Sequence, residues 1–380
     1  MAETEPVRRP LPSSRGARLV GADLERCIFC DGTSIRREGK RQKKHEAIQL
    51  WYCRDCDRVF TAQRAKGKTY PLKVVHESLI HYYRGETRAQ TSRRIAERFG
   101  ITVPSRTLSN WIAEYRPLTT YARLREEGAR LFRPNRIIRS VRLHHQQVYE
   151  YRIHQAKLAT ILAGSEHSRF RPVEKFLYDM VTSCPHALFL TDSRASQGRT
   201  PFNLDTVEIK SKRNHACQVA DRVLQAVTHH KRRHDELQRF MLTTDSVTVA
   251  VEVPVYLTLE DLEELKGTPG LEVPIETSTT LTGHVDVLQL RHGAIHILDY
   301  KPNAKAEKPI AQLMVYALAL SRRTGLRVYD FVCAWFDEQH YYEFYPLHVI
   351  HKGRHAVLTW RGRANGQTST ARRRDRPPPD

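Results

Sequence analysis

The stretch GHVDVLQLRHGAIHILDYK, residues 283–301, predicts two short strands joined by a tight turn. Residues 283–290 and 295–301 are rich in Val, Ile and Leu, and a link of four residues is of the kind that closes a β-hairpin. If the hairpin is symmetric about this link, Asp286 lies opposite Asp299. Like charges that face each other across a ladder are unfavourable, so we expect a cation between the two carboxylates.

Lys301 adds a positive charge to the same face of the predicted hairpin. It follows Asp299 by two residues, and side chains two apart on a strand emerge on one side. Two carboxylates and an ammonium group that converge on one sheet face can hold Mg2+ and orient a water molecule. The metal stabilises charge on a phosphoryl oxygen, and the lysine positions or activates the nucleophile.

A helix is predicted directly after the hairpin, over residues 310–320, with Pro309 at its start. Gln312 and Tyr316 are four residues apart and therefore share one face of this helix. The rest of the helix is apolar, so these two polar side chains indicate a face turned towards the metal site or its phosphate.

The three motifs G-x-x-D (283–286), D-Y-K (299–301) and Q-x-x-x-Y (312–316) together resemble the RecB-type branch of the PD-(D/E)XK nuclease superfamily. The resemblance covers roughly residues 210–350. An ordinary hairpin followed by a core helix is the alternative interpretation. The resemblance implies roles for the metal ligands Asp286 and Asp299, the catalytic Lys301, and the accessory helix residues Gln312 and Tyr316.

The third metal ligand is not fixed by these motifs. In RecB-type relatives a histidine from an upstream helix often completes the metal shell, and residues 214–240 are predicted to form one long helix. His215 is the best positional match and is the expected ligand. The side chains that remain open as alternatives are His229, His230, His234, Glu252 and Glu276.

The composition fits a globular protein with an excess of positive charge. Hydrophobic residues make up 40%, the formal net charge is +20, and residues 1–120 hold 24 Lys or Arg against 13 Asp or Glu. Such a surface attracts polyanions by releasing their counterions, so DNA is the expected partner. No apolar run reaches the length of a bilayer span and no secretory leader is recognised. We therefore expect a cytoplasmic, nucleoid-associated protein that binds no membrane.

Four of the seven cysteines follow the pattern C-x2-C-x22-C-x2-C near the N-terminus. Cys27 with Cys30, and Cys53 with Cys56, supply four thiolates on two tight knuckles, which is a closed tetrahedral shell for structural Zn2+. The segment resembles a zinc ribbon. A redox C-x-x-C is the alternative, and the doubled motif argues against it.

A helix-turn-helix is predicted after the cysteines. Apolar positions recur at helical spacing over residues 71–83, Thr87 can cap a helix over 88–99, and a third helix is predicted over 104–115. The pattern resembles the helix-turn-helix of transposases and site-specific recombinases, although any compact three-helix segment can mimic it. A recognition helix reads base edges with its N-terminal side chains, here Ser105, Arg106, Ser109 and Asn110.

The expected fold is multidomain: a zinc ribbon and a helix-turn-helix, then an α/β restriction-endonuclease-like domain with a mixed central sheet. The expected segments are a flexible basic N-terminus (1–20), the zinc ribbon (21–66), the helix-turn-helix (70–117), a helical connector (118–165), the PD-(D/E)XK nuclease domain (166–355) and a disordered tail (365–380).

The expected function is hydrolysis of DNA phosphodiester bonds with Mg2+ or Mn2+. Docking modules for duplex DNA favour an endonuclease, because processive exonucleases usually need a motor and no P-loop motif is present. The alternatives are a DNA-binding regulator or mobile-element accessory protein with a degenerate nuclease domain, and a transposase-like strand-transfer enzyme. The sequence leaves open a homodimer, the target site, and a role in repair, defence or transposition.

Overall fold

The computed structural model describes residues 24, 26–62, 69–119, 122–191, 193–196, 202, 208–212, 214–227, 232–275 and 277–351. The expected flexible N-terminus (1–20) and disordered tail (365–380) lie outside the described residues. So do three of the alternative metal ligands, namely His229, His230 and Glu276.

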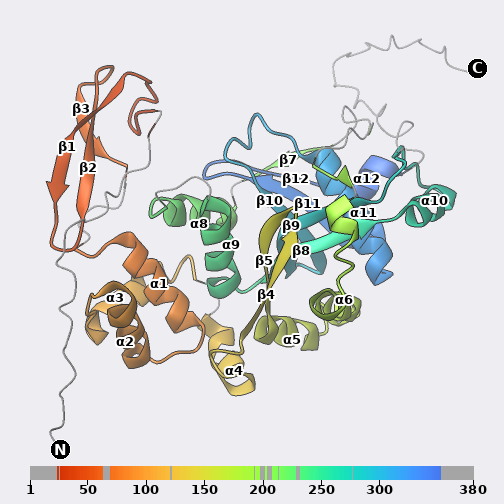
Figure 1. The fold of residues 1–380 in the computed structure, drawn as a ribbon, viewed down its shortest axis with the longest axis horizontal. Coiled ribbons are helices and arrows are strands. Elements are labelled where there is room, and N and C mark those ends of the chain that lie inside the picture. Colours follow the sequence, from red (N-terminus) through yellow and green to blue (C-terminus); the bar gives the residue numbers. More distant parts are fainter. Residues whose placement is uncertain are drawn as a thin grey trace, which may run out of the picture.

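A small antiparallel sheet holds the N-terminal cysteine knuckles. Its strands β1 (Ile35–Gln42), β2 (Ala47–Cys53) and β3 (Arg58–Thr61) pair in that order. β1 is almost entirely exposed, whereas β2 buries most of its residues. The small core is formed by Cys27, Trp51, Cys53 and Phe60. Figure 1 shows this sheet in red and orange, well apart from the large sheet.

Three helices follow at the predicted places: α1 (Leu72–Tyr83), α2 (Arg88–Phe99) and α3 (Ser105–Tyr115). Thr87 caps α2 as predicted, because its hydroxyl accepts the Gln90 N–H while the Gln90 side chain accepts the Thr87 N–H. Gly100 ends α2 in the left-handed conformation, with φ 66°.

These three helices share one hydrophobic cluster with the large domain. Buried residues of α1 and α3 pack with α8 (His215–Leu224) and α9 (Arg233–Thr244). Glu77 on α1 is buried and accepts hydrogen bonds from Arg239 on α9 at 2.6 and 2.5 Å, and from Arg98 on α2 at 2.7 Å. The helices are therefore tied to the large domain through both an apolar contact and an ion pair whose carboxylate is buried.

Nine strands of the described residues form the large mixed sheet, in the order β4-β5-β8-β9-β10-β11-β12-β7, with β6 beside β9. Neighbouring strands are antiparallel except for the parallel pairs β10–β11 and β6–β9. The strands are β4 (Ile138–His145), β5 (Gln147–His154), β6 (Ser193–Arg194), β7 (Lys210–Ser211), β8 (Thr248–Leu257), β9 (Leu281–Arg291), β10 (Ala294–Tyr300), β11 (Phe331–Phe336) and β12 (Tyr341–Phe344).

Helices cover both faces of this sheet (Figure 1). Ile295 and Ile297 of β10 pack in one cluster with α5, α6 and α11, whereas Leu298 and Tyr300 pack in the other with α8 and α9. Within the described residues, the other named helical segments are α4 (Ala122–Leu131), α5 (Gln155–Ala163), η1 (Ser168–Phe170), α6 (Arg171–Thr182), α7 (Leu188–Thr191), α10 (Leu259–Gly267), α11 (Ile310–Thr324), η4 (Val328–Asp330) and α12 (Pro346–Ile350).

The hairpin register predicted from the sequence is confirmed. The pairs run from Ala294 with Arg291 to Leu298 with Val287, and the next pair in this register is Asp299 with Asp286. The predicted helix after the hairpin is α11, which crosses back to the parallel strand β11. This βαβ connection brings the carboxyl end of β10 and the start of α11 together.

Two predictions about helices were wrong. Residues 118–165 are not a wholly helical connector, because β4 and β5 form a hairpin within them, turning at Gln146 with φ 58°. Burial in β4 alternates, with Leu143 and His145 inside and their neighbours exposed, which is the period of a strand. The single helix predicted over 214–240 is instead two, α8 and α9.

Among the described residues, none of the helices combines the length and hydrophobicity that crossing a bilayer requires.

Candidate active site and cysteine cluster

Three acidic side chains stand on three neighbouring strands. Asp299 follows Leu298 on β10 and is opposite Asp286 on β9, and the Asp286 carboxylate accepts the backbone N–H of Tyr300 at 3.1 Å. Strand β8 pairs with the other edge of β9. Val251 pairs with Val287 and Val253 with Val285, so Glu252, between the two valines of β8, is level with Asp286. Glu252, Asp286 and Asp299 therefore form one row across the sheet.

Glu252 is held in a conformation that side chains rarely adopt. Its φ is 53°, in the left-handed region, although it lies inside a strand. Val251 packs in the cluster of α8 and α9, whereas Val253 packs in the opposite cluster, so the strand turns over at Glu252. Residues in such strained conformations concentrate at functional sites.

Helix α9 presents two side chains to this row. His234 Nδ1 lies 3.3 Å from Asp286 Oδ2, and Gln238 Nε2 donates to Glu252 Oε1 at 2.7 Å. The two residues are four apart and share one helix face. The His234 side chain is 41% exposed, so the row is open to solvent on this side.

Helix α11 presents a second pair, from the other side of the sheet. Gln312 Nε2 donates to Asp299 Oδ1 at 3.4 Å and to the Tyr316 hydroxyl at 2.9 Å. Lys301 Nζ lies 2.8 Å from Asp299 Oδ2. The structure thus brings together the five residues to which the sequence resemblance assigns catalytic roles, namely Asp286, Asp299, Lys301, Gln312 and Tyr316.

The close approach of the Tyr316 ring to position 283 explains why the first motif begins with glycine. A Cβ atom at this position would lie 2.3 Å from Cε1 of the Tyr316 ring, closer than such contacts occur. The absence of a side chain lets α11 approach β9 and set Tyr316 and Gln312 beside Asp299.

The carboxylates repel one another in a buried setting. Burial, and then the charge of Asp286, raises the pKa of Asp299 to about 7, against the opposing effect of Lys301. The same two causes raise the pKa of Glu252 to about 8. Burial lowers the pKa of His234, but the contact with Asp286 raises it above its ordinary value. The row therefore attracts cations.

Among the described residues, no hydrogen bond or ion pair joins His215, the expected third ligand, to the row. It begins α8, and its Nε2 is buried without a hydrogen-bond partner in the described part of the chain. The histidine beside Asp286 is His234. The sequence analysis did not predict a role for Gln238. Its four-residue spacing from His234, the same as that between Gln312 and Tyr316, is the signal that could have identified it.

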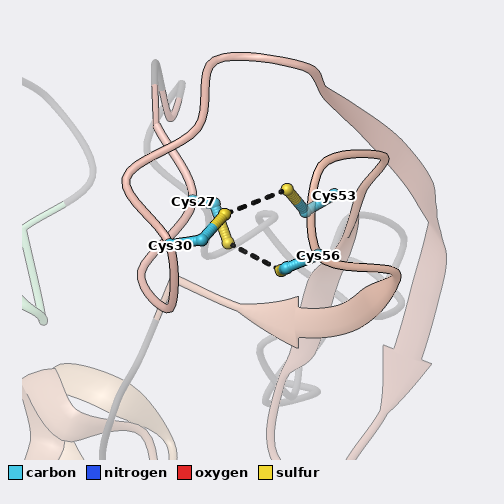
Figure 2. A group of neighbouring side chains, drawn as sticks. All are labelled: Cys27, Cys30, Cys53 and Cys56. Carbon is cyan, nitrogen blue, oxygen red and sulfur yellow. Dashed lines mark hydrogen bonds between the residues drawn. The ribbon is translucent and has the colours of Figure 1, made fainter.

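The four N-terminal cysteines form a compact cluster, which Figure 2 shows. Their sulfur atoms all lie within 4.8 Å of one another, with Cys27 and Cys56 at 3.6 Å and Cys30 and Cys53 at 3.7 Å. Four thiolates at the usual zinc–sulfur distance stand about 3.8 Å apart in a tetrahedron. The cluster therefore has the donor set and spacing to hold Zn2+.

The predicted DNA contacts lie at the start of α3. Ser105, Arg106 and Asn110 are exposed, whereas the Ser109 hydroxyl accepts a hydrogen bond from Arg88 at 2.8 Å and donates to the Ser105 carbonyl. A hollow of about 340 Å³ adjoins this helix. Its basic lining residues are Arg88, Arg116 and Arg125.

Comparison with known protein families agrees with this geometry. Residues 179–341 match the model of the PD-(D/E)XK nuclease superfamily, which supports a domain of that superfamily over this part of the chain. The matched range contains Glu252, the β9–β10 hairpin and α11. Searches of curated proteins and of solved structures gave no significant match. A domain of this superfamily indicates a nuclease that uses divalent metal ions.

Proposed function

We propose that this chain is an endonuclease of the RecB-type branch that hydrolyses DNA phosphodiester bonds with Mg2+ or Mn2+. The observation that carries the proposal is the row of Glu252, Asp286 and Asp299, with the Lys301 ammonium against Asp299, inside the matched domain. Carboxylate oxygens are the ligands that Mg2+ prefers, and burial together with the charge of Asp286 raises the pKa values of Asp299 and Glu252.

Each residue of the row has a role in the proposal. Asp286 and Asp299 hold the metal ion, and Glu252 and His234 complete its shell in place of His215. A bound Mg2+ would stabilise the negative charge of the phosphoryl oxygens. Lys301 orients the attacking water and stabilises its developing hydroxide charge, since its ammonium group is already fixed 2.8 Å from Asp299.

The pair on α11 acts through Asp299. Gln312 donates to one oxygen of Asp299 and is itself held by the Tyr316 hydroxyl, so the helix fixes the rotamer of this carboxylate. Gln312 and Tyr316 are therefore positioning residues in this proposal. The alternative expected from the sequence, that they bind the phosphate directly, predicts a change in DNA affinity on mutation.

The N-terminal modules would dock the enzyme on duplex DNA, as a zinc ribbon and a helix-turn-helix. In support, β1 is exposed and basic, and the guanidinium groups of Arg36 and Arg37 lie over the rings of Tyr52 and Trp51. Ser105, Arg106 and Asn110 on α3 would read bases, while the basic hollow beside them would hold phosphates.

Cleavage of covalently closed circular DNA tests the proposal. The wild-type protein should nick or linearise such a plasmid with Mg2+ and not with a chelator present. Asp286→Asn and Asp299→Asn should abolish cleavage, whereas Asp235→Asn, a neighbouring half-exposed carboxylate on α9, should retain it. Cleavage that persists in both site variants would disprove the assignment, and wild-type inactivity on duplex, single-stranded and branched DNA would favour a DNA-binding protein.

A further inference from the structure

A second compact group of metal-binding side chains lies outside the candidate active site. His145 ends β4, and Cys184 and His186 lie in the connection between α6 and α7. The His145 Nε2 atom is 2.8 Å from His186 Nδ1 and 4.0 Å from Cys184 Sγ, and the three ligand atoms all lie within 4.8 Å of one another. His145 and Cys184 are buried, whereas His186 is exposed.

His284 orients the central histidine of this group. Its Nε2 lies 2.9 Å from His145 Nδ1, on the side of the ring away from the other two ligands. When His145 Nδ1–H donates to His284, the lone pair of His145 Nε2 points at His186 and Cys184. Metal-binding histidines are commonly fixed by such a second hydrogen bond.

The surroundings keep both rings in place and neutral. The His284 ring stacks on Tyr149 at 3.6 Å between centroids, and the His145 ring stacks on Phe189 at 4.1 Å. Both rings are buried, and burial disfavours the charged imidazolium form. A neutral imidazole is the form that binds a metal ion.

We propose that a divalent transition metal ion is bound by His145 Nε2, His186 Nδ1 and Cys184 Sγ, with water as the fourth ligand. The chemistry of these ligands favours Zn2+. Two imidazoles and a thiolate suit Zn2+ and do not suit Mg2+. No further His, Cys, Asp or Glu of the described residues joins the group. The exposed His186 leaves the fourth position accessible to solvent.

The observed spacing is close to that of a zinc site. At the usual bond lengths, two nitrogens on tetrahedral zinc stand about 3.3 Å apart, and a nitrogen and a sulfur about 3.6 Å apart. The two distances here, 2.8 and 4.0 Å, reach those values through shifts of about 0.5 Å. Binding replaces the hydrogen bond between His145 and His186, moves the His186 proton to its other nitrogen, and releases the Cys184 thiol proton.

Such a site would stabilise the edge of the sheet next to the candidate active site. It would tie the edge strand β4 to the α6–α7 connection, and His284 is two residues before Asp286 on β9. The metal would hold the β9 segment that carries Asp286, without taking part in cleavage. This inference does not depend on nuclease activity.

The zinc content of the full-length protein tests the proposal, measured after dialysis against a zinc-buffered solution. His186→Ala and Cys184→Ser should each hold one zinc ion fewer per chain than the wild type. The matched controls His144→Ala, an exposed neighbour on β4, and Cys217→Ser, a buried thiol on α8, should hold the wild-type number. X-ray absorption at the zinc edge should show nitrogen ligands in the wild type and lose them in His186→Ala.

The proposal is overturned if His186→Ala and Cys184→Ser retain the wild-type zinc content, or if the wild type shows sulfur ligands alone. Because His186 is exposed, its loss leaves the core intact, and circular dichroism of His186→Ala checks the fold. The cysteine cluster is unchanged in all four variants. Incomplete zinc loading of the cysteine cluster therefore lowers the zinc content of the wild type and of all variants equally. The difference of one zinc ion between the wild type and the two site variants remains.

Discussion

Glu252 on β8 lies directly across from Asp286 on β9, at the point where both strands turn over between the two hydrophobic clusters. The left-handed backbone of Glu252, with φ 53°, sends its carboxylate towards α9, where Gln238 holds it. The pairing of β8 with β9 thus places two partly buried carboxylates next to each other. Their repulsion is a cost to the metal-free protein that a bound cation would remove.

The first prediction concerns pH and stability. The pKa of Glu252 is about 8 in the folded protein and about 4.3 in an unfolded chain, so folding takes up a proton between these values. Stability from this group therefore falls as the pH rises from about 4 to about 8. In Mg2+-free buffer, Glu252→Gln should raise the Tm by at least about 2 °C at pH 8.5 and change it little at pH 5. An equal shift at both pH values would contradict the burial of this charge.

The second prediction separates the two candidate histidines. His234→Ala should weaken Mg2+ binding about 10- to 100-fold, because His234 contacts Asp286, whereas His215→Ala should leave it within about threefold. Titration of Mg2+ by calorimetry, with the cleavage rate as a second readout, measures both. The opposite ranking would restore His215 as the ligand.

The third prediction concerns the contact of α11 with β9. Gly283→Ala should destabilise the protein by about 1–3 kcal/mol, because its Cβ would overlap the Tyr316 ring. Tyr316→Ala in the same chain should recover part of this loss. Gly267→Ala, where the added Cβ meets open space, is the control and should be nearly neutral. Chemical denaturation measures all three, and an unaffected Gly283→Ala would show that α11 sits further from the sheet.

The fourth prediction concerns the link between the N-terminal helices and the large domain. Glu77→Gln leaves the partly buried Arg239 without its carboxylate and should destabilise the protein by about 3–5 kcal/mol. Glu97→Gln, an exposed carboxylate on α2, should change stability by less than about 0.5 kcal/mol. If Glu77→Gln were equally mild, the two parts of the chain would not be held by this ion pair.

Local sequence patterns predicted much of the fold and of the candidate site. The β9–β10 register followed from the symmetry of a four-residue link, and the cysteine cluster from doubled knuckles. His234 could not be chosen over His215 from sequence, because the choice depends on how α9 docks against β9. The position of the Glu252 carboxylate depends on a left-handed backbone conformation inside a strand. A sequence predicts that conformation only where the residue is glycine. The β4–β5 hairpin was missed because its polar, histidine-rich alternation was interpreted as helical.

The cleavage rate of Lys301→Met tests the central claim most directly. Under single-turnover conditions with Mg2+, this variant should cut closed circular DNA at least about 100-fold more slowly than the wild type, while its DNA affinity stays within about threefold. Lys305→Met, an exposed lysine four residues away, should cut at the wild-type rate. Cleavage by Lys301→Met at the rate of Lys305→Met would contradict a catalytic site built on Asp286, Asp299 and Lys301.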